Sequence, residues 1–133
     1  MPKQYTLALI AHDHKKDEMA RWANEHLAIL THFRLVGTGH TAAVVEEATG
    51  LKVEAYLSGP LGGDQEIGAE VAKGGIDAVI FFVDPLEAQP HDPDVKALIR
   101  ICGVYDVPLA TTPSTASLII TSPRLGEYLG RMK

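Results

Sequence analysis

Five short apolar runs alternate along the chain with segments of helical periodicity. The runs occupy residues 5–11, 33–36, 53–57, 78–83 and 107–110. Strand–helix–strand spacing of this kind is typical of right-handed crossovers, which produce a parallel sheet covered by helices on both faces. The first and fourth runs are almost continuously apolar, as expected for central strands buried on both sides. The pattern predicts a three-layer α/β/α fold around a doubly wound, five-stranded parallel sheet.

The segments between the runs carry helix start and stop signals. Segment 16–30 places one apolar stripe along a helix, formed by Met19, Trp22, Ala23, His26, Leu27 and Leu30. Segment 40–50 ends at Gly50, which suits a left-handed helix stop, and segment 65–73 is followed by two further glycines. Asp92-Pro93 is a typical helix start for the segment that follows it. With no repeat or linker in the sequence, we expect one domain spanning residues 1–133.

Composition narrows the class of protein. The 133 residues carry a net charge of -5, which argues against binding to nucleic acid or to an anionic membrane. The single cysteine, Cys102, excludes a disulfide within one chain. No apolar run approaches the roughly 20 residues of a membrane span, and the N-terminus lacks the features of a signal peptide. We therefore expect a soluble, cytoplasmic protein.

Polar residues follow the apolar runs, at the point where each predicted strand ends. They include His12, Asp13, His14 and Lys16 after the first run, Thr38, Gly39, His40 and Thr41 after the second, Ser58, Gly59 and Asp64 after the third, Asp84, His91, Asp92 and Asp94 after the fourth, and Thr111 and Thr112 after the fifth. In a parallel sheet all these turns lie along one edge, where open α/β proteins bind their ligands. The sequence predicts a binding or catalytic site at that edge.

The motif GTGHTA, residues 37–42, matches a dinucleotide-binding fingerprint only weakly. It follows the second strand rather than the first, and Glu54 lies at the start of the next strand, out of reach of a ribose. We favour a single phosphate bound at a helix N-terminus by the glycines and the hydroxyls of Thr38 and Thr41. A helix start without any ligand remains an alternative.

Two other features have competing interpretations. His12 and His14, with Asp64, Asp84 or Asp94, could form a metal site, but alternate residues of an extended segment point in opposite directions. An aspartate placed like Asp64, directly after a glycine turn and at a helix start, is most often a helix cap. Because so many polar residues share one edge of the sheet, we favour a functional role for the set.

Four segments together resemble the methylglyoxal synthase family. They are AHDHKK (11–16), SGPLGGDQ (58–65), FFVDPL (81–86) and PHDPDVKALIR (90–100), and the resemblance extends over about residues 7–121. It implies a parallel strand order of 3-2-1-4-5 and a homohexamer. It also implies a lyase without cofactor or metal, which converts dihydroxyacetone phosphate to methylglyoxal and inorganic phosphate and is inhibited by phosphate.

The resemblance also assigns roles to individual residues. It makes Asp64 the catalytic base and implies further catalytic roles for His91, Asp94 and Asp13. The positions that hold the substrate and its phosphate are His12, Lys16, Thr38, Gly39, Thr41, Ser58, Gly59 and His91. The family usually has Thr-Gly-Thr-Thr where this chain has Thr38-Gly39-His40-Thr41, so His40 is a departure. The chain also ends early relative to longer members of the family.

Two other classes of function compete with the lyase. One is a non-catalytic domain that binds a phosphorylated effector, like the regulatory domain of carbamoyl-phosphate synthetase, which resembles the same fold. Such a domain would not need both Asp64 and His91. The other is a metal-dependent hydrolase built on His12, His14 and Asp64, which a chelator would inactivate.

Overall fold

The computed structural model describes residues 4–58, 61–86 and 92–129. The five strands are β1 (Thr6–Ala11), β2 (Arg34–Thr38), β3 (Val53–Tyr56), β4 (Ala78–Phe82) and β5 (Leu109–Ala110). The α-helices are α1 (Lys16–Glu25), α2 (Leu27–Leu30), α3 (Gly39–Thr49), α4 (Gly63–Ala72), α5 (Asp92–Val104) and α6 (Pro113–Thr121). Short 3-10 helices, η1 (Asp13–Lys15) and η3 (Leu125–Glu127), complete the described elements.

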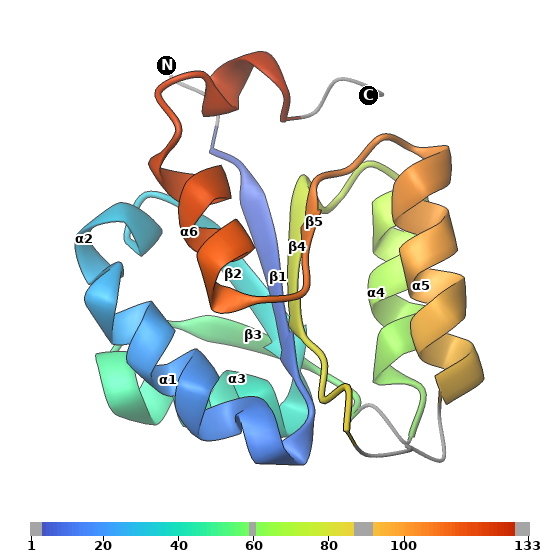
Figure 1. Cartoon of the computed structure of the whole chain (residues 1–133), viewed down its shortest axis with the longest axis horizontal. Coiled ribbons are helices and arrows are strands. Elements are labelled where there is room, and N and C mark those ends of the chain that lie inside the picture. The colour runs from blue at the N-terminus through green and yellow to red at the C-terminus, as the bar shows by residue number, and fades with distance from the viewer. Residues whose placement is uncertain (1–3, 59–60, 87–91, 130–133) are drawn as a thin grey trace.

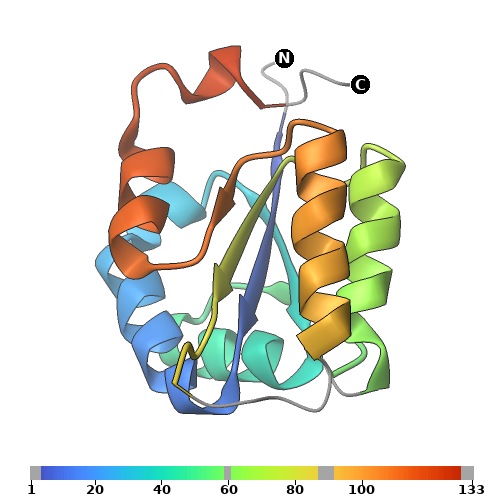
Figure 2. The ribbon, with the colours of Figure 1, turned by 45° about the vertical axis from the view of Figure 1, so that its right-hand side comes forward.

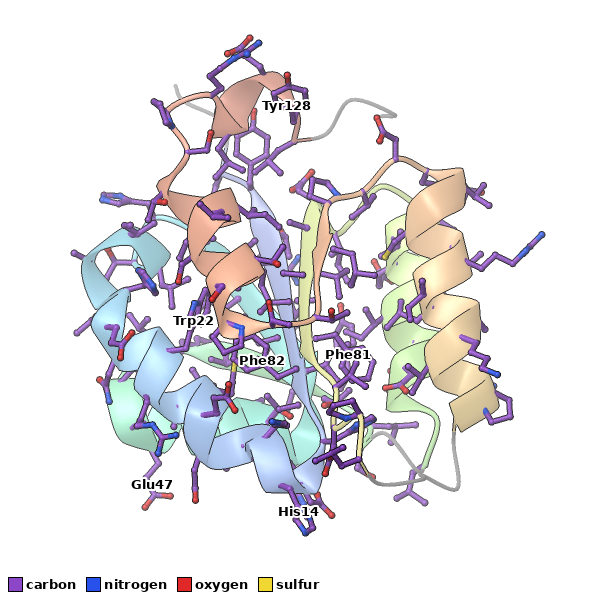
Figure 3. The ribbon with its side chains drawn as sticks, in the orientation of Figure 1. His14, Trp22, Glu47, Phe81, Phe82 and Tyr128 are labelled. Atoms are coloured by element: carbon purple, nitrogen blue, oxygen red, sulfur yellow. The ribbon has the colours of Figure 1, made fainter. Side chains whose placement is uncertain are left out.

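The strands form one parallel sheet in the order β3-β2-β1-β4-β5, as predicted. Helices α1, α3 and α6 cover one face of this sheet, and α4 and α5 lie side by side on the other (Figures 1 and 2). Each face has its own apolar core, and the side chains of Phe81 and Phe82 enter opposite cores because successive strand residues point to opposite faces (Figure 3). The predicted three-layer α/β/α architecture is therefore confirmed.

The predicted strands and helices are present, with local differences. The expected helix over residues 16–30 is interrupted at His26, which separates α1 from α2 and has a non-helical φ of -112° and ψ of 22°. The end of α3 at Gly50 is as predicted, with a left-handed φ of 76°. Helix α6 was not predicted, although Thr112 caps it through its side chain and Pro113 occupies its first turn.

Packing between α1 and α6 explains the position of His26. The Trp22 indole N–H donates to Ser117 Oγ over 3.1 Å, and this same oxygen lies 2.9 Å from His26 Nε2. A cavity of about 630 Å³ beside this network contains none of the predicted site residues. His26 is thus a helix-packing residue and Trp22 a core residue, as the sequence indicated. None of the helices in the described ranges combines the length and apolarity needed to cross a bilayer.

Candidate active site

The carboxyl ends of the strands meet at one edge of the sheet, at the bottom of Figure 1. Strands β1, β2, β3 and β4 end there, and helices α1, α3, α4 and α5 begin there. His14 marks this edge in Figure 3. The convergence predicted from the sequence is therefore present. The N-termini of several helices also place positive dipole ends along this edge, which favours anions.

Asp64 lies in the first turn of α4 and is only 1% exposed. The turn that places it there requires glycine: a Cβ on Gly63 would stand 2.0 Å from the carbonyl oxygen of Leu57. The interpretation of Asp64 as a helix cap is wrong, because the N-cap is Gly62 and Asp64 is the second helical residue. The close approach of Gly63 to Leu57, just after β3, places the Asp64 carboxylate inside the protein.

His12 follows β1 and is 5% exposed, and its ring forms a T-shaped pair with Phe81 at a centroid distance of 5.2 Å. Its Nδ1 accepts a hydrogen bond of 2.9 Å from the main-chain N–H of Asp84. Because Nδ1 is the acceptor, the proton of the neutral imidazole is on Nε2, which can then donate a hydrogen bond. This main-chain contact spans 72 residues of sequence, so no local motif could have predicted it.

His14, two residues further on, is 69% exposed and has its Nδ1 at 3.4 Å from Asp84 Oδ2. Asp84 is itself nearly buried, and its Oδ1 accepts from the N–H of Leu86 over 3.0 Å. His12 is buried and His14 exposed, yet both contact Asp84, and the extended segment expected here is wrong because residues 13–15 form the 3-10 helix η1. Among the described residues no group of three His, Cys, Asp or Glu side chains is arranged to hold a metal ion, so the alternative of a metal site gains no support.

Asp13 and Lys16 form a short ion pair at the same edge. The Lys16 Nζ donates to Asp13 Oδ1 over 2.6 Å, with Lys16 mostly buried and Asp13 86% exposed. This hydrogen bond and the charge of Lys16 lower the pKa of the Asp13 carboxyl, and the charges of His40 and His14 lower it further. Asp13 therefore remains ionised. The Lys16 ammonium, the Asp13 carboxylate and the imidazoles of His14 and His40 share this corner of the site.

The start of α3 contains two buried hydroxyls. Thr41 Oγ1 accepts from the N–H of Ala11 over 3.2 Å and also from Thr38 Oγ1 over 3.3 Å. Thr38 is the N-cap residue of α3 by position, yet its side chain makes no capping hydrogen bond. Gly39 lies close to β3, since a Cβ there would stand 3.2 Å from the carbonyl oxygen of Tyr56. The strand ends and the helix start are thus held tightly together.

The remaining predicted residues fall at this edge or outside the described ranges. The carbonyl oxygen of Ser58 accepts from the N–H groups of Leu61 and Gly63 and thereby forms the turn before Asp64. Asp94 belongs to the first turn of α5. Gly59 and His91 lie outside the described residues.

The fold and the polar edge define an α/β domain with an enzyme-like site, and comparison with known proteins narrows the class. A family model described as "MGS-like domain" matches residues 18–111. A methylglyoxal synthase from Pseudoalteromonas atlantica is 58% identical over 95% of this chain and 93% of its own length. One from Leptospira interrogans is 52% identical over 93% of this chain and 84% of its own.

A solved structure agrees with these matches. The crystal structure of methylglyoxal synthase from Elizabethkingia anophelis superposes with a TM-score of 0.87 at 50% sequence identity, covering 94% of this chain and 82% of that chain. The chain therefore belongs to the methylglyoxal synthase family and is an enzyme of the lyase class.

Proposed function

We propose that the protein converts dihydroxyacetone phosphate to methylglyoxal and inorganic phosphate through an enediolate, without a metal or cofactor and with Asp64 as the general base. One observation carries this proposal: in a chain of this family, a carboxylate that is 1% exposed lies in the first turn of a helix at the ligand-binding edge of the sheet. A carboxylate removed from water is a stronger base than a hydrated one.

In the first step, Asp64 removes a proton from the hydroxyl-bearing carbon next to the substrate carbonyl. The C–H electron pair forms a carbon–carbon double bond, and the carbonyl oxygen takes the negative charge. The Nε2–H of His12 is suited to donate a hydrogen bond to an oxygen of this enediolate, because Nδ1 is occupied as an acceptor. The family resemblance supports similar roles for His91, Asp94 and Asp13 in stabilising the intermediate and moving protons.

In the second step, the enediolate collapses and expels phosphate. The hydroxyl on the deprotonated carbon loses its proton and becomes the aldehyde carbonyl, the electron pair of the carbon–carbon double bond moves to form a double bond to the phosphate-bearing carbon, and the C–O bond to phosphate breaks. The resulting enolate takes a proton on its methylene carbon and becomes methylglyoxal. Phosphate leaves when its C–O bond stands perpendicular to the enediolate plane. Lys16, Thr38, Gly39, Ser58 and Gly59 would hold the phosphate in that pose.

Thr41 would contribute to this binding through its main chain rather than its side chain. Its hydroxyl already contacts Ala11 and Thr38, so its main-chain N–H is the group suited to bind phosphate. The first N–H groups of a helix have no acceptor within the helix and favour anions.

We also propose, from the family resemblance, one domain over residues 1–133, a homohexamer, inhibition by inorganic phosphate and a cytoplasmic location. Analytical ultracentrifugation tests the hexamer, and a rate measurement at rising phosphate concentration tests the inhibition.

The central test is incubation of the purified protein with dihydroxyacetone phosphate in the presence of a chelator. Methylglyoxal and phosphate are measured together, with Asp64→Asn in parallel. The proposal expects equal amounts of both products from the wild type and almost none from the variant. Substrate binding without products would contradict the lyase and favour an effector-binding domain, whereas loss of activity in chelator alone would favour a metal enzyme.

A further inference from the structure

An apolar groove of about 260 Å³ lies between α4 and α5 and includes Asp64. The two helices begin at the same edge of the sheet and lie side by side (Figures 1 and 2). Asp64 and Gln65, in the first turn of α4, form the end of the groove that is nearest this edge. The other described residues that line it are apolar, namely Gly68, Ala69 and Ala72 of α4 and Ala97, Leu98 and Ile101 of α5.

Small side chains keep this groove open. Asp64, Gly68 and Ala72 follow one another at intervals of four residues and therefore share one face of α4. Gly68 and Leu98 are buried, whereas Ala97 is exposed, so the groove runs inward from the surface. A Cβ on Gly68 would lie 3.9 Å from Leu98 Cδ1, which is an ordinary contact distance. A larger residue would therefore fit at position 68, but it would occupy space in the groove one turn from Asp64.

The proposed reaction gives this space a possible occupant. Asp64 takes a proton from the hydroxyl-bearing carbon of the substrate, so that carbon must come against its carboxylate. In dihydroxyacetone phosphate the same carbon carries a second hydrogen, which leaves the groove empty. A substituent in place of this hydrogen would lie beside Asp64, where the groove begins. Since an apolar cavity of roughly 150 Å³ can hold benzene, the groove has room for a short alkyl group.

We propose that the protein also eliminates phosphate from ketose phosphates that carry a short alkyl group on the hydroxyl-bearing carbon, and that Gly68 determines this specificity. The inference rests on the proposed function, because it assumes that Asp64 is the base. With a methyl group, Asp64 removes the remaining proton of the hydroxyl-bearing carbon and an enediolate forms. The hydroxyl then becomes a ketone, the C–O bond to phosphate breaks, and the enolate takes a proton on its methylene carbon. The products are diacetyl and inorganic phosphate, and no oxidant or reductant is needed.

The methyl analogue of dihydroxyacetone phosphate, substituted on its hydroxyl-bearing carbon, is the probe for this inference. Each enantiomer is assayed separately, because only one can present its proton to Asp64 while its methyl group enters the groove. We expect the wild type to release diacetyl and phosphate in equal amounts from that enantiomer. Gly68→Ala should lower the ratio of kcat/KM for the methyl analogue to kcat/KM for dihydroxyacetone phosphate by about tenfold, since the added methyl group takes the place of the substituent. Ala97→Leu, which fills the groove from α5, should lower the same ratio.

Gly103→Ala is the matched control, because it makes the same substitution near the end of α5, where a Cβ would meet nothing within 4 Å. It should leave the ratio at the wild-type value. Production of methylglyoxal without diacetyl by the wild type would overturn the inference and leave the proposed function intact. An unchanged ratio in both Gly68→Ala and Ala97→Leu would also overturn it, and altered sedimentation of these variants would then assign the groove to a contact between copies of the chain. Failure of the wild type to produce methylglyoxal would instead overturn the proposed function, and with it the role of Asp64 on which the inference rests.

Discussion

The two ends of the sheet each contain a buried aspartate, and the two carboxylates have different surroundings. Asp77, 2% exposed, lies just before β4 at the amino edge, where its Oδ2 accepts from the N–H of Thr6 over 2.8 Å. Its own N–H donates to the carbonyl oxygen of Thr6, so residue 77 secures the first pairing of β1 with β4. Asp64, equally buried, lies at the carboxyl edge in a helix turn.

Because these two residues are equally buried, burial alone cannot distinguish the proposed base from a structural carboxylate. Asp77 is fixed by main-chain hydrogen bonds that belong to the sheet, at the edge away from the helix N-termini. Asp64 lies in the first turn of α4, at the edge where β1, β2 and β4 end (Figure 1). Position relative to the strand ends, rather than exposure, separates the structural carboxylate from the proposed base.

The largest expected effect is on catalysis, from Asp64→Asn. The amide has the same shape but cannot accept the substrate proton, so the rate of methylglyoxal formation should fall by about 10² to 10⁴-fold. The melting temperature should change little, because the substitution removes both the cost of burying a charge and the interactions that offset this cost. Asp77→Asn is the matched control and should retain normal kcat. A similar loss of kcat in both variants would mean that the two edges do not differ as described.

Gly63→Ala should impair both folding and activity. The new Cβ would lie 2.0 Å from the carbonyl oxygen of Leu57, so the turn or α4 must move, at a cost of about 3 kcal/mol in unfolding free energy. That movement displaces Asp64 and should lower kcat as well. Gly68→Ala is the control on the same helix, since its Cβ would meet only Leu98 Cδ1 at 3.9 Å. Denaturant unfolding that gives equal stabilities for the two variants would contradict this account.

Asp77→Ala should lower stability without affecting chemistry. It leaves the buried N–H of Thr6 without its carboxylate acceptor, which costs about 2 kcal/mol. Urea unfolding should show this loss, while kcat per folded molecule remains that of the wild type. Asp77→Asn keeps an acceptor oxygen and should recover part of the stability. A reduced kcat in Asp77→Ala would link the amino edge to catalysis.

The smallest effect concerns the ion pair between Asp13 and Lys16. Lys16 holds the pKa of the Asp13 carboxyl below its usual value, so Lys16→Gln should raise that pKa, as carboxyl NMR titration can measure. A lowered pKa in the folded state stabilises the protein above the unfolded-state pKa, and this stabilisation disappears as pH falls through the folded-state pKa. The wild type and variant should therefore converge in stability in strong acid. Lys15→Gln, which removes a contact with Glu18 instead, should leave Asp13 unchanged.

Much of the fold followed from local sequence patterns. Each of the five apolar runs overlaps one of the five strands, and α3 ends at Gly50 as predicted. These features depend on side-chain periodicity and on the backbone preferences of single residues, both of which act over a few positions. Helix α6 was not predicted, although Thr112-Pro113 is a typical helix start. The break at His26 had no such signal, since it depends on packing against Ser117.

Within the site, the sequence by itself determined which chemical groups gather at the carboxyl edge. Strand ends in a parallel sheet must share an edge, so the polar residues after each strand could be assigned there from their spacing. Only the tertiary structure decided how those groups are used. The burial of Asp64, the orientation of His12 by Asp84 and the structural role of Asp77 all depend on contacts between distant parts of the chain. Such contacts form when the whole core packs, and no local pattern encodes them.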